Sequence, residues 1–98
     1  MKDTQLIPIP SLCTHYQIEM SFFDGLSEYG LIEYISVEKT YCIHQDQIAD
    51  IEKMIRLHQD LHLNFEGIDT VFNLLEKIDY LQSELKTTQN RLRRFEEN

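Results

Sequence analysis

The chain has 98 residues, of which 42% are hydrophobic, and this content is enough for one globular domain with a modest core. Its 9 basic and 17 acidic residues give a formal net charge of -8, which repels nucleic-acid phosphates and favours a basic protein partner. The apolar runs fall far short of the roughly 20 residues that cross a bilayer, so we expect no membrane segment.

Two short helices are predicted after a short N-terminal tail. Pro10 is well placed to open the first helix, over about residues 10–17, because its fixed φ angle suits the first helical turn. The second helix begins near Glu19 or Ser21, either of which would be its N-cap. It stops at Gly30, since glycine readily adopts the left-handed conformation that ends a helix.

The second helix has two different faces at 100° per residue. Phe22, Leu26 and Tyr29 share the face expected to meet the core, and Ser21, Asp24 and Glu28 share the opposite, exposed face. Ser21 and Asp24 also form a weak capping box. Phe23 flanks the core face and is favoured as a core residue over a contact for a partner. A glycine inside a helix costs up to about 1 kcal/mol, so we expect Gly25 to let the first helix approach closely.

The segment EYISVEKTYCIH alternates and is rich in β-branched and aromatic residues. This pattern predicts two short strands, over about residues 33–37 and 40–43, joined near Glu38 and Lys39. The resulting hairpin would be a wing beside the two helices.

Asp46 is predicted to cap a third helix, over about residues 47–62. Its apolar residues fall in two stripes, Ile48, Ile51 and Ile55 in one and Met54, Leu57 and Leu61 in the other. A helix that is apolar on two sides lies centrally in a small domain. The residues expected to face water are Glu52, Lys53, Arg56 and Asp60.

Asn64 is predicted to start a fourth helix that runs to about Phe95, roughly 45 Å at 1.5 Å per residue. Its heptad stripe has one polar member, Thr88, and otherwise consists of Val71, Leu74, Ile78, Leu81, Leu85, Leu92 and Phe95. Such a helix needs another helix against it, so we expect a homodimer. Charge favours an antiparallel pair, with acidic Glu76, Asp79 and Glu84 in the first half and basic Lys86, Arg91, Arg93 and Arg94 in the second.

These elements predict a mainly α fold in one structural domain. A winged helix-turn-helix with a small β-hairpin wing, residues 1–63, is followed by a long C-terminal coiled-coil helix for dimerisation, residues 64–98. This order resembles the MerR superfamily, whose second helix often ends in GLI, as at residues 30–32. The chain also resembles the chaperone-modulator CbpM family across nearly its whole length. The segments that carry this resemblance are LIPIPSLCTHYQIE, LSEYGLIE and LHQDLHLNFEGIDTVFNLLEKI.

The CbpM resemblance implies a regulator that binds the J-domain of a DnaJ/CbpA-type co-chaperone and blocks its stimulation of Hsp70. DNA-binding MerR relatives usually carry arginines about where Asp24 and Cys42 stand, so the resemblance also implies weak or lost DNA binding. A J-domain carries a basic helix beside its His-Pro-Asp loop, and an acidic second helix complements that charge. The predicted partner-binding residues are Ser21, Phe23, Asp24 and Glu28.

The alternative function is a MerR-like transcriptional regulator that reads DNA as a dimer. Charge argues against it, because residues 1–45 hold two lysines and six acidic residues. The three arginines of RLRR, residues 91–94, are an alternative nucleic-acid anchor, but charge pairing within the coiled coil is the favoured reading.

A third hypothesis is a metal-responsive regulator that uses His58 and His62, one helical turn apart. The pair lacks the general-base glutamate of an HExxH motif and has no evident third ligand, so we expect no metal site. Cys13 and Cys42 lack CxxC spacing and no secretory segment precedes them, which predicts a reduced, cytoplasmic protein. With no catalytic triad and no phosphate-binding glycine loop in the sequence, we expect neither enzyme activity nor a cofactor.

Overall fold

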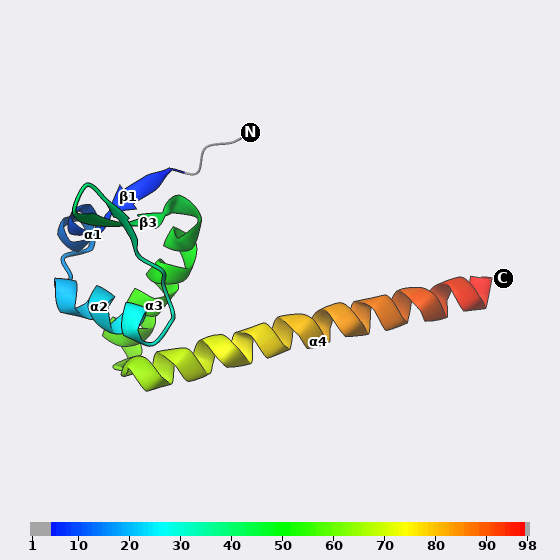
Figure 1. The fold of residues 1–98 in the computed structure, drawn as a ribbon. Helices are drawn as coiled ribbons and strands as arrows, with labels where there is room; N and C mark the ends of the chain where they lie inside the picture. The colour runs from blue at the N-terminus through cyan, green and yellow to red at the C-terminus, as the bar shows by residue number, and fades with distance from the viewer. Residues whose placement is uncertain (1–4, 98) are drawn as a thin grey trace.

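The computed structural model describes residues 5–97, with side chains as far as residue 96, and the chain is mainly helical (Figure 1). In chain order the elements are β1 (Leu6–Pro8), α1 (Ile9–Tyr16), α2 (Met20–Glu28), β2 (Ile35–Val37), β3 (Thr40–His44), the 3-10 turn η1 (Gln45–Gln47), α3 (Ile48–Leu61) and α4 (Phe65–Glu97). The predicted fold class is confirmed, since a helix-turn-helix, a hairpin and a long C-terminal helix follow one another.

The sheet contains one strand that the sequence pattern did not predict. β1 pairs antiparallel with β3, which also pairs antiparallel with β2, so the order among the described residues is β1-β3-β2. The predicted N-terminal tail is therefore wrong for Leu6 and Ile7, which pair with the end of β3. Three residues ending in Pro8 carry too little alternation to indicate a strand, and only pairing with a distant segment defines it.

The end of α2 confirms the role of Gly30. Gly30 has a φ of 72°, in the left-handed region. The Leu31 amide donates to the Leu26 carbonyl at 2.9 Å, and the Gly30 amide donates to the Ser27 carbonyl at 3.0 Å. These two hydrogen bonds form a Schellman motif, which satisfies the last carbonyls of the helix and turns the chain toward the wing.

The beginnings of the helices agree less well with the predictions. Glu19 is the N-cap of α2, so Ser21 lies inside the first turn and its predicted capping box is wrong. Asp46 is not the cap of α3 either, because it lies within the 3-10 turn and the helix begins after the following residue. Asn64 does start α4, and its Oδ1 accepts a hydrogen bond from the Gly67 amide at 2.8 Å.

β2 and β3 form the predicted hairpin, with Glu38 and Lys39 at its turn. Both residues have positive φ angles, 49° and 67°, as in a type I′ turn, whose twist matches that of the two strands. β2 begins two residues later than predicted, at Ile35, so Tyr34 immediately precedes the strand. β3 extends one residue further than predicted.

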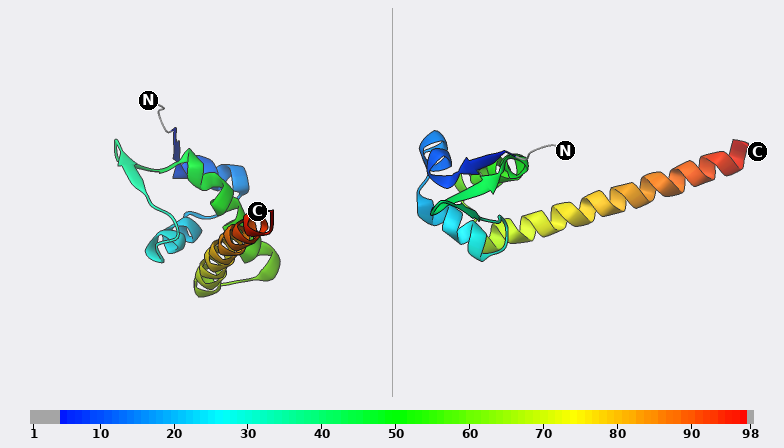
Figure 2. Two further views of the ribbon diagram at one scale, coloured as in Figure 1. Left: turned by 90° about the vertical axis from the view of Figure 1, so that its right-hand side faces the viewer. Right: turned by 45° about the horizontal axis from the view of Figure 1, so that its top comes forward.

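The core lies between α1, α2, α3, the sheet and the first turns of α4 (Figure 2). Its buried members are Ile9, Leu12, Phe22, Phe23, Leu26, Ile32, Ile43, Ile51, Met54, Ile55 and Ile68. Ile68 anchors the start of α4, after which the helix leaves the globular part (Figures 1 and 2). The molecule is consequently elongated, and its longest dimension is 61 Å.

Two residues predicted to face the core are exposed. Tyr29 is the C-cap of α2 and turns outward, where its ring stacks on Phe65 with centroids 5.7 Å apart. Leu61 is 63% exposed because it is the last residue of α3, and His62 then adopts a left-handed conformation that turns the chain. The second apolar stripe of the third helix therefore ends before Leu61.

Gly25 is the site of a close approach, but Phe65 makes it rather than the first helix. A Cβ atom built on Gly25 would overlap the ring of Phe65. That ring also packs against Phe22, with centroids 5.8 Å apart. The absent side chain thus lets the first residue of α4 lie directly on α2, and the expectation that α1 fills this space is wrong.

Replacing Gly25 with Ala should therefore destabilise the domain, by about 1–3 kcal/mol, because the added methyl displaces the Phe65 ring. Helix propensity alone predicts the opposite sign, a gain of up to about 1 kcal/mol. Urea unfolding of the two proteins measures the difference. In a Phe65→Ala background the Gly25→Ala penalty should vanish, and a stabilised single variant would contradict the packing argument.

Candidate functional site

The exposed face of α2 carries three of the four predicted partner-binding residues. Ser21, Asp24 and Glu28 are all exposed and follow one another along the helix. Phe23 is fully buried, because it projects from the opposite side of α2 into the core. A side chain without accessible surface does not contact a partner, so the inclusion of Phe23 in the partner-binding set is wrong.

A tyrosine that precedes the wing holds Asp24. The Tyr34 hydroxyl donates a hydrogen bond to Asp24 Oδ1 at 2.8 Å. Burial, together with this bond and the charge of Asp24, raises the pKa of Tyr34, so the hydroxyl stays a donor at neutral pH. The Tyr34 ring stacks on Tyr41, with centroids 4.9 Å apart and planes at 21°. The alternating strand pattern placed both tyrosines in the hairpin, but it contained no signal for their link to α2.

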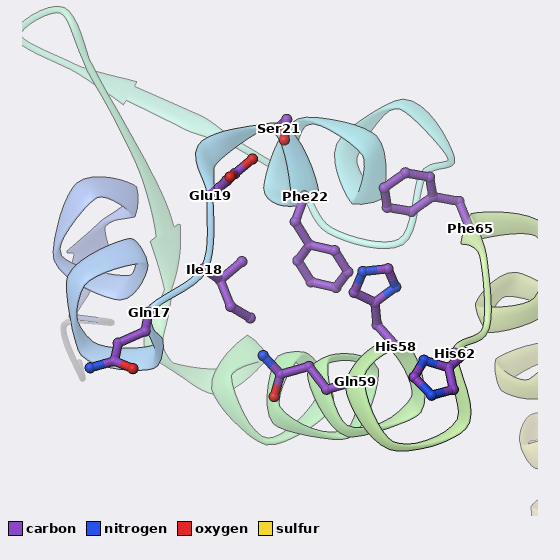
Figure 3. A pocket seen from close by; sticks show the side chains of 9 residues that line it. All are labelled: Gln17, Ile18, Glu19, Ser21, Phe22, His58, Gln59, His62 and Phe65. Atoms are coloured by element: carbon purple, nitrogen blue, oxygen red, sulfur yellow. The ribbon is translucent and has the colours of Figure 1, made fainter.

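An open groove of about 700 Å³ borders the exposed face of α2, between α2, α3 and the start of α4 (Figure 3). Aromatic rings form much of its wall, and the Phe22 centroid lies 4.8 Å from that of His58 and 5.8 Å from that of Phe65. The lining residues are Gln17, Ile18, Glu19, Ser21, Phe22, His58, Gln59, His62 and Phe65. Ser21 belongs to both surfaces, so the groove and the exposed α2 face are continuous.

The two histidines of this groove have local structural roles. Nδ1 of His58 lies 3.0 Å from the backbone carbonyl oxygen of Leu63, and its ring packs on Phe22. His62 is the left-handed C-cap of α3. Across the described part of the chain, no three His, Cys, Asp or Glu side chains gather where they would hold a metal ion. Both histidines shape the corner between α3 and α4.

The two cysteines are free thiols in different settings. Cys42 is only 6% exposed, so the side chain at this position faces the core and not the outer surface of the wing. A charged side chain there would meet the core, and the neighbouring Tyr41 is the exposed residue of β3. Burial raises the pKa of Cys13, an effect that Asp24 increases and a backbone hydrogen bond opposes, so its thiol is not an activated nucleophile.

The apolar stripe of α4 faces water in the single chain. Its members are the half-buried Val71 and the exposed Leu74, Ile78, Leu81, Leu85 and Leu92, with Phe95 at 82% exposure. Leu75 and Tyr80 add exposed apolar surface outside the predicted stripe. Among residues 5–97, no helix combines the length and apolar character needed to cross a membrane.

Comparison with known proteins assigns the fold to a family. The model of the family described as MerR HTH family regulatory protein matches residues 7–90. The chain belongs to this family.

The chain is also similar to proteins named chaperone modulatory protein CbpM. The relative from Pseudomonas entomophila is 27% identical over 86 residues, covering 87% of this chain and 85% of the relative. The relative from Escherichia coli O1:K1 is 26% identical over 93 residues, covering 94% and 92%. The relative from Pseudomonas putida is 28% identical over 86 residues, covering 87% and 85%.

In this MerR-family fold, α1 and α2 form the helix-turn-helix, and β2 and β3 form the wing. When a helix-turn-helix binds DNA, its second helix enters the major groove. Here the exposed face of that helix carries Asp24 and Glu28, and carboxylates repel backbone phosphates. The helix that enters the groove in a DNA-binding helix-turn-helix is therefore acidic on its exposed face here.

Proposed function

We propose that this protein is a chaperone modulator that docks on the J-domain of a DnaJ/CbpA-type co-chaperone and inhibits its stimulation of Hsp70. The observation that carries the proposal is the exposed acidic face of α2, at the position where a DNA reader needs positive charge. The names of the similar proteins support a chaperone-regulating role. The action is that of a binding protein in the cytoplasm, without enzyme activity or cofactor.

Charge complementarity gives the proposed docking a physical basis. The resemblance implies a J-domain with a basic helix next to its His-Pro-Asp loop, the surface that meets Hsp70. An acidic protein with a net charge of -8 attracts such a surface over distances of about a Debye length, roughly 8 Å at physiological salt. Occupying the basic helix excludes Hsp70 from it, so docking and inhibition follow from the same contact.

A homodimer through α4 completes the proposal. The helix of 33 residues extends well beyond the globular part and exposes an apolar stripe that is interrupted at Thr88. Antiparallel pairing brings the acidic first half of each helix beside the basic second half of the other. Each dimer would carry two docking surfaces, one on each globular part.

Two measurements test the docking function directly. Titration calorimetry with an isolated J-domain should give saturable binding that weakens as salt rises, because long-range attraction is what salt screens. An ATPase assay with Hsp70 and the co-chaperone should lose its co-chaperone stimulation as this protein is added. No binding by the intact protein at low salt would refute the proposal.

The family fold makes DNA binding the second candidate. We expect binding to duplex DNA to be weak and non-specific, with a dissociation constant no tighter than about the micromolar range typical of such binding. Gel-shift titrations at several salt concentrations check this expectation. Sequence-selective, salt-resistant binding at nanomolar protein would favour a transcriptional regulator instead.

A further inference from the structure

The wing and α2 share one continuous surface, joined by a tyrosine. In the hairpin register Ser36 pairs with Tyr41, and Tyr34 lies two residues before Ser36. Side chains alternate along a strand, so the two tyrosines lie on the same face as diagonal neighbours, and their rings stack at 4.9 Å. Tyr34 is half-buried and packs against the core, whereas Tyr41 is 51% exposed and presents its ring to solvent.

The hydrogen bond from Tyr34 adds an oriented carboxylate to this stack. The Tyr34 hydroxyl donates a hydrogen bond to Asp24 Oδ1 at 2.8 Å, and Asp24 remains exposed on α2. A carboxylate has about four lone-pair sites on its two oxygens, so one accepted bond leaves acceptor capacity for another donor. Asp24, Tyr34 and Tyr41 are called the tyrosine–aspartate patch below.

We propose that the tyrosine–aspartate patch binds an arginine side chain on the basic helix of the docked partner. The proposal rests on the proposed docking function and extends it from α2 to the wing. A guanidinium group is planar and weakly hydrated, so it stacks on an aromatic ring while its edge donates to a carboxylate. The exposed ring of Tyr41 and the carboxylate of Asp24 both contact Tyr34, and they offer these two interactions. A lysine ammonium is a compact and strongly hydrated charge, so it binds the ring and the carboxylate together less well.

Calorimetric titration with the isolated J-domain tests the aromatic half of the patch. Tyr41→Ala should weaken binding about 3- to 30-fold. This is the effect of losing a cation–π contact, from an exposed contact at the low end to a desolvated one at the high end. Tyr80→Ala is the matched control, because Tyr80 is a similarly exposed tyrosine on α4, away from the patch. Equal affinity of Tyr41→Ala and wild type would overturn the assignment.

A double-mutant cycle tests whether Asp24 and Tyr41 hold the same group. If both contact one arginine, the combined loss for Asp24→Ala and Tyr41→Ala should be smaller than the product of the single losses. A combined loss of affinity equal to the product of the two single losses would overturn the shared-arginine assignment.

Tyr34→Phe keeps the ring stack and removes only the hydrogen bond that positions Asp24. It should weaken binding about 2- to 5-fold, less than Tyr41→Ala, and lower the melting temperature by no more than a few degrees.

A basic peptide separates failure of the patch from failure of the docking function. If the wild-type protein does not bind the J-domain, the docking function is wrong, and an arginine-rich helical peptide then probes the patch alone. Nuclear magnetic resonance should show shifts at Tyr34 and Tyr41 with this peptide, and smaller shifts with a lysine version of it. Equal shifts with both peptides, or shifts elsewhere only, would overturn the arginine assignment.

Discussion

Replacing Leu81 with Asp is expected to convert a dimer into monomers. Leu81 lies in the middle of the apolar stripe of α4 and is 62% exposed in the single chain. In the proposed dimer it is buried against the partner helix, where an unpaired carboxylate costs several kcal/mol. A symmetric dimer carries the change twice, so the dissociation constant should rise by roughly three decades or more. Light scattering and sedimentation at micromolar concentrations measure the change.

The matched control is Ser83→Asp, which adds the same charge to the same helix outside the apolar stripe. It should leave the dimer largely intact, because the added carboxylate stays in water. Neither position belongs to the globular core, so both variants should keep the helical content of the N-terminal elements. A wild-type chain that is monomeric at micromolar concentration would contradict the proposed dimer.

Reversing both Asp24 and Glu28 to Lys is expected to weaken J-domain binding by one to two decades. Single exposed ion pairs contribute little, about 0–1 kcal/mol, but replacing attraction with repulsion at two positions costs roughly 2–3 kcal/mol. Much of the loss should lie in the association rate and shrink as salt rises. Stopped-flow binding across a salt series measures both effects. The reversal also removes the acceptor of the Tyr34 hydrogen bond, but the fold should survive, since both residues are exposed.

The control for this reversal is Asp46→Lys with Asp50→Lys. The pair has the same spacing and charge change and is exposed near the start of α3. Glu52, although it faces water as predicted, is a poorer control, because its carboxylate accepts a hydrogen bond from Tyr16 at 2.7 Å. If the α3 reversal abolishes binding while the α2 reversal does not, α2 is the wrong surface, even though the partner class survives.

Local patterns in the sequence were sufficient to predict most helices of this protein. Gly30 ends α2 and Asn64 begins α4, because the conformational freedom of glycine and the capping chemistry of asparagine act within one turn. Helical periodicity also identified the exposed acidic face of α2 and the apolar stripe of α4. Each of these features depends on residues only a few positions apart, so a single sequence contains the whole signal.

Contacts between distant segments were decided only by the tertiary structure. Three contacts join separate elements: β1 pairs with β3, the Phe65 ring packs against Gly25, and the Tyr34 hydroxyl donates a hydrogen bond to Asp24. No periodicity within one element specifies its neighbour, because packing geometry depends on how several elements fit together at once. The sequence by itself therefore determined the helices and the charge of their faces, while the tertiary structure decided that Asp24 belongs to a surface shared with the wing.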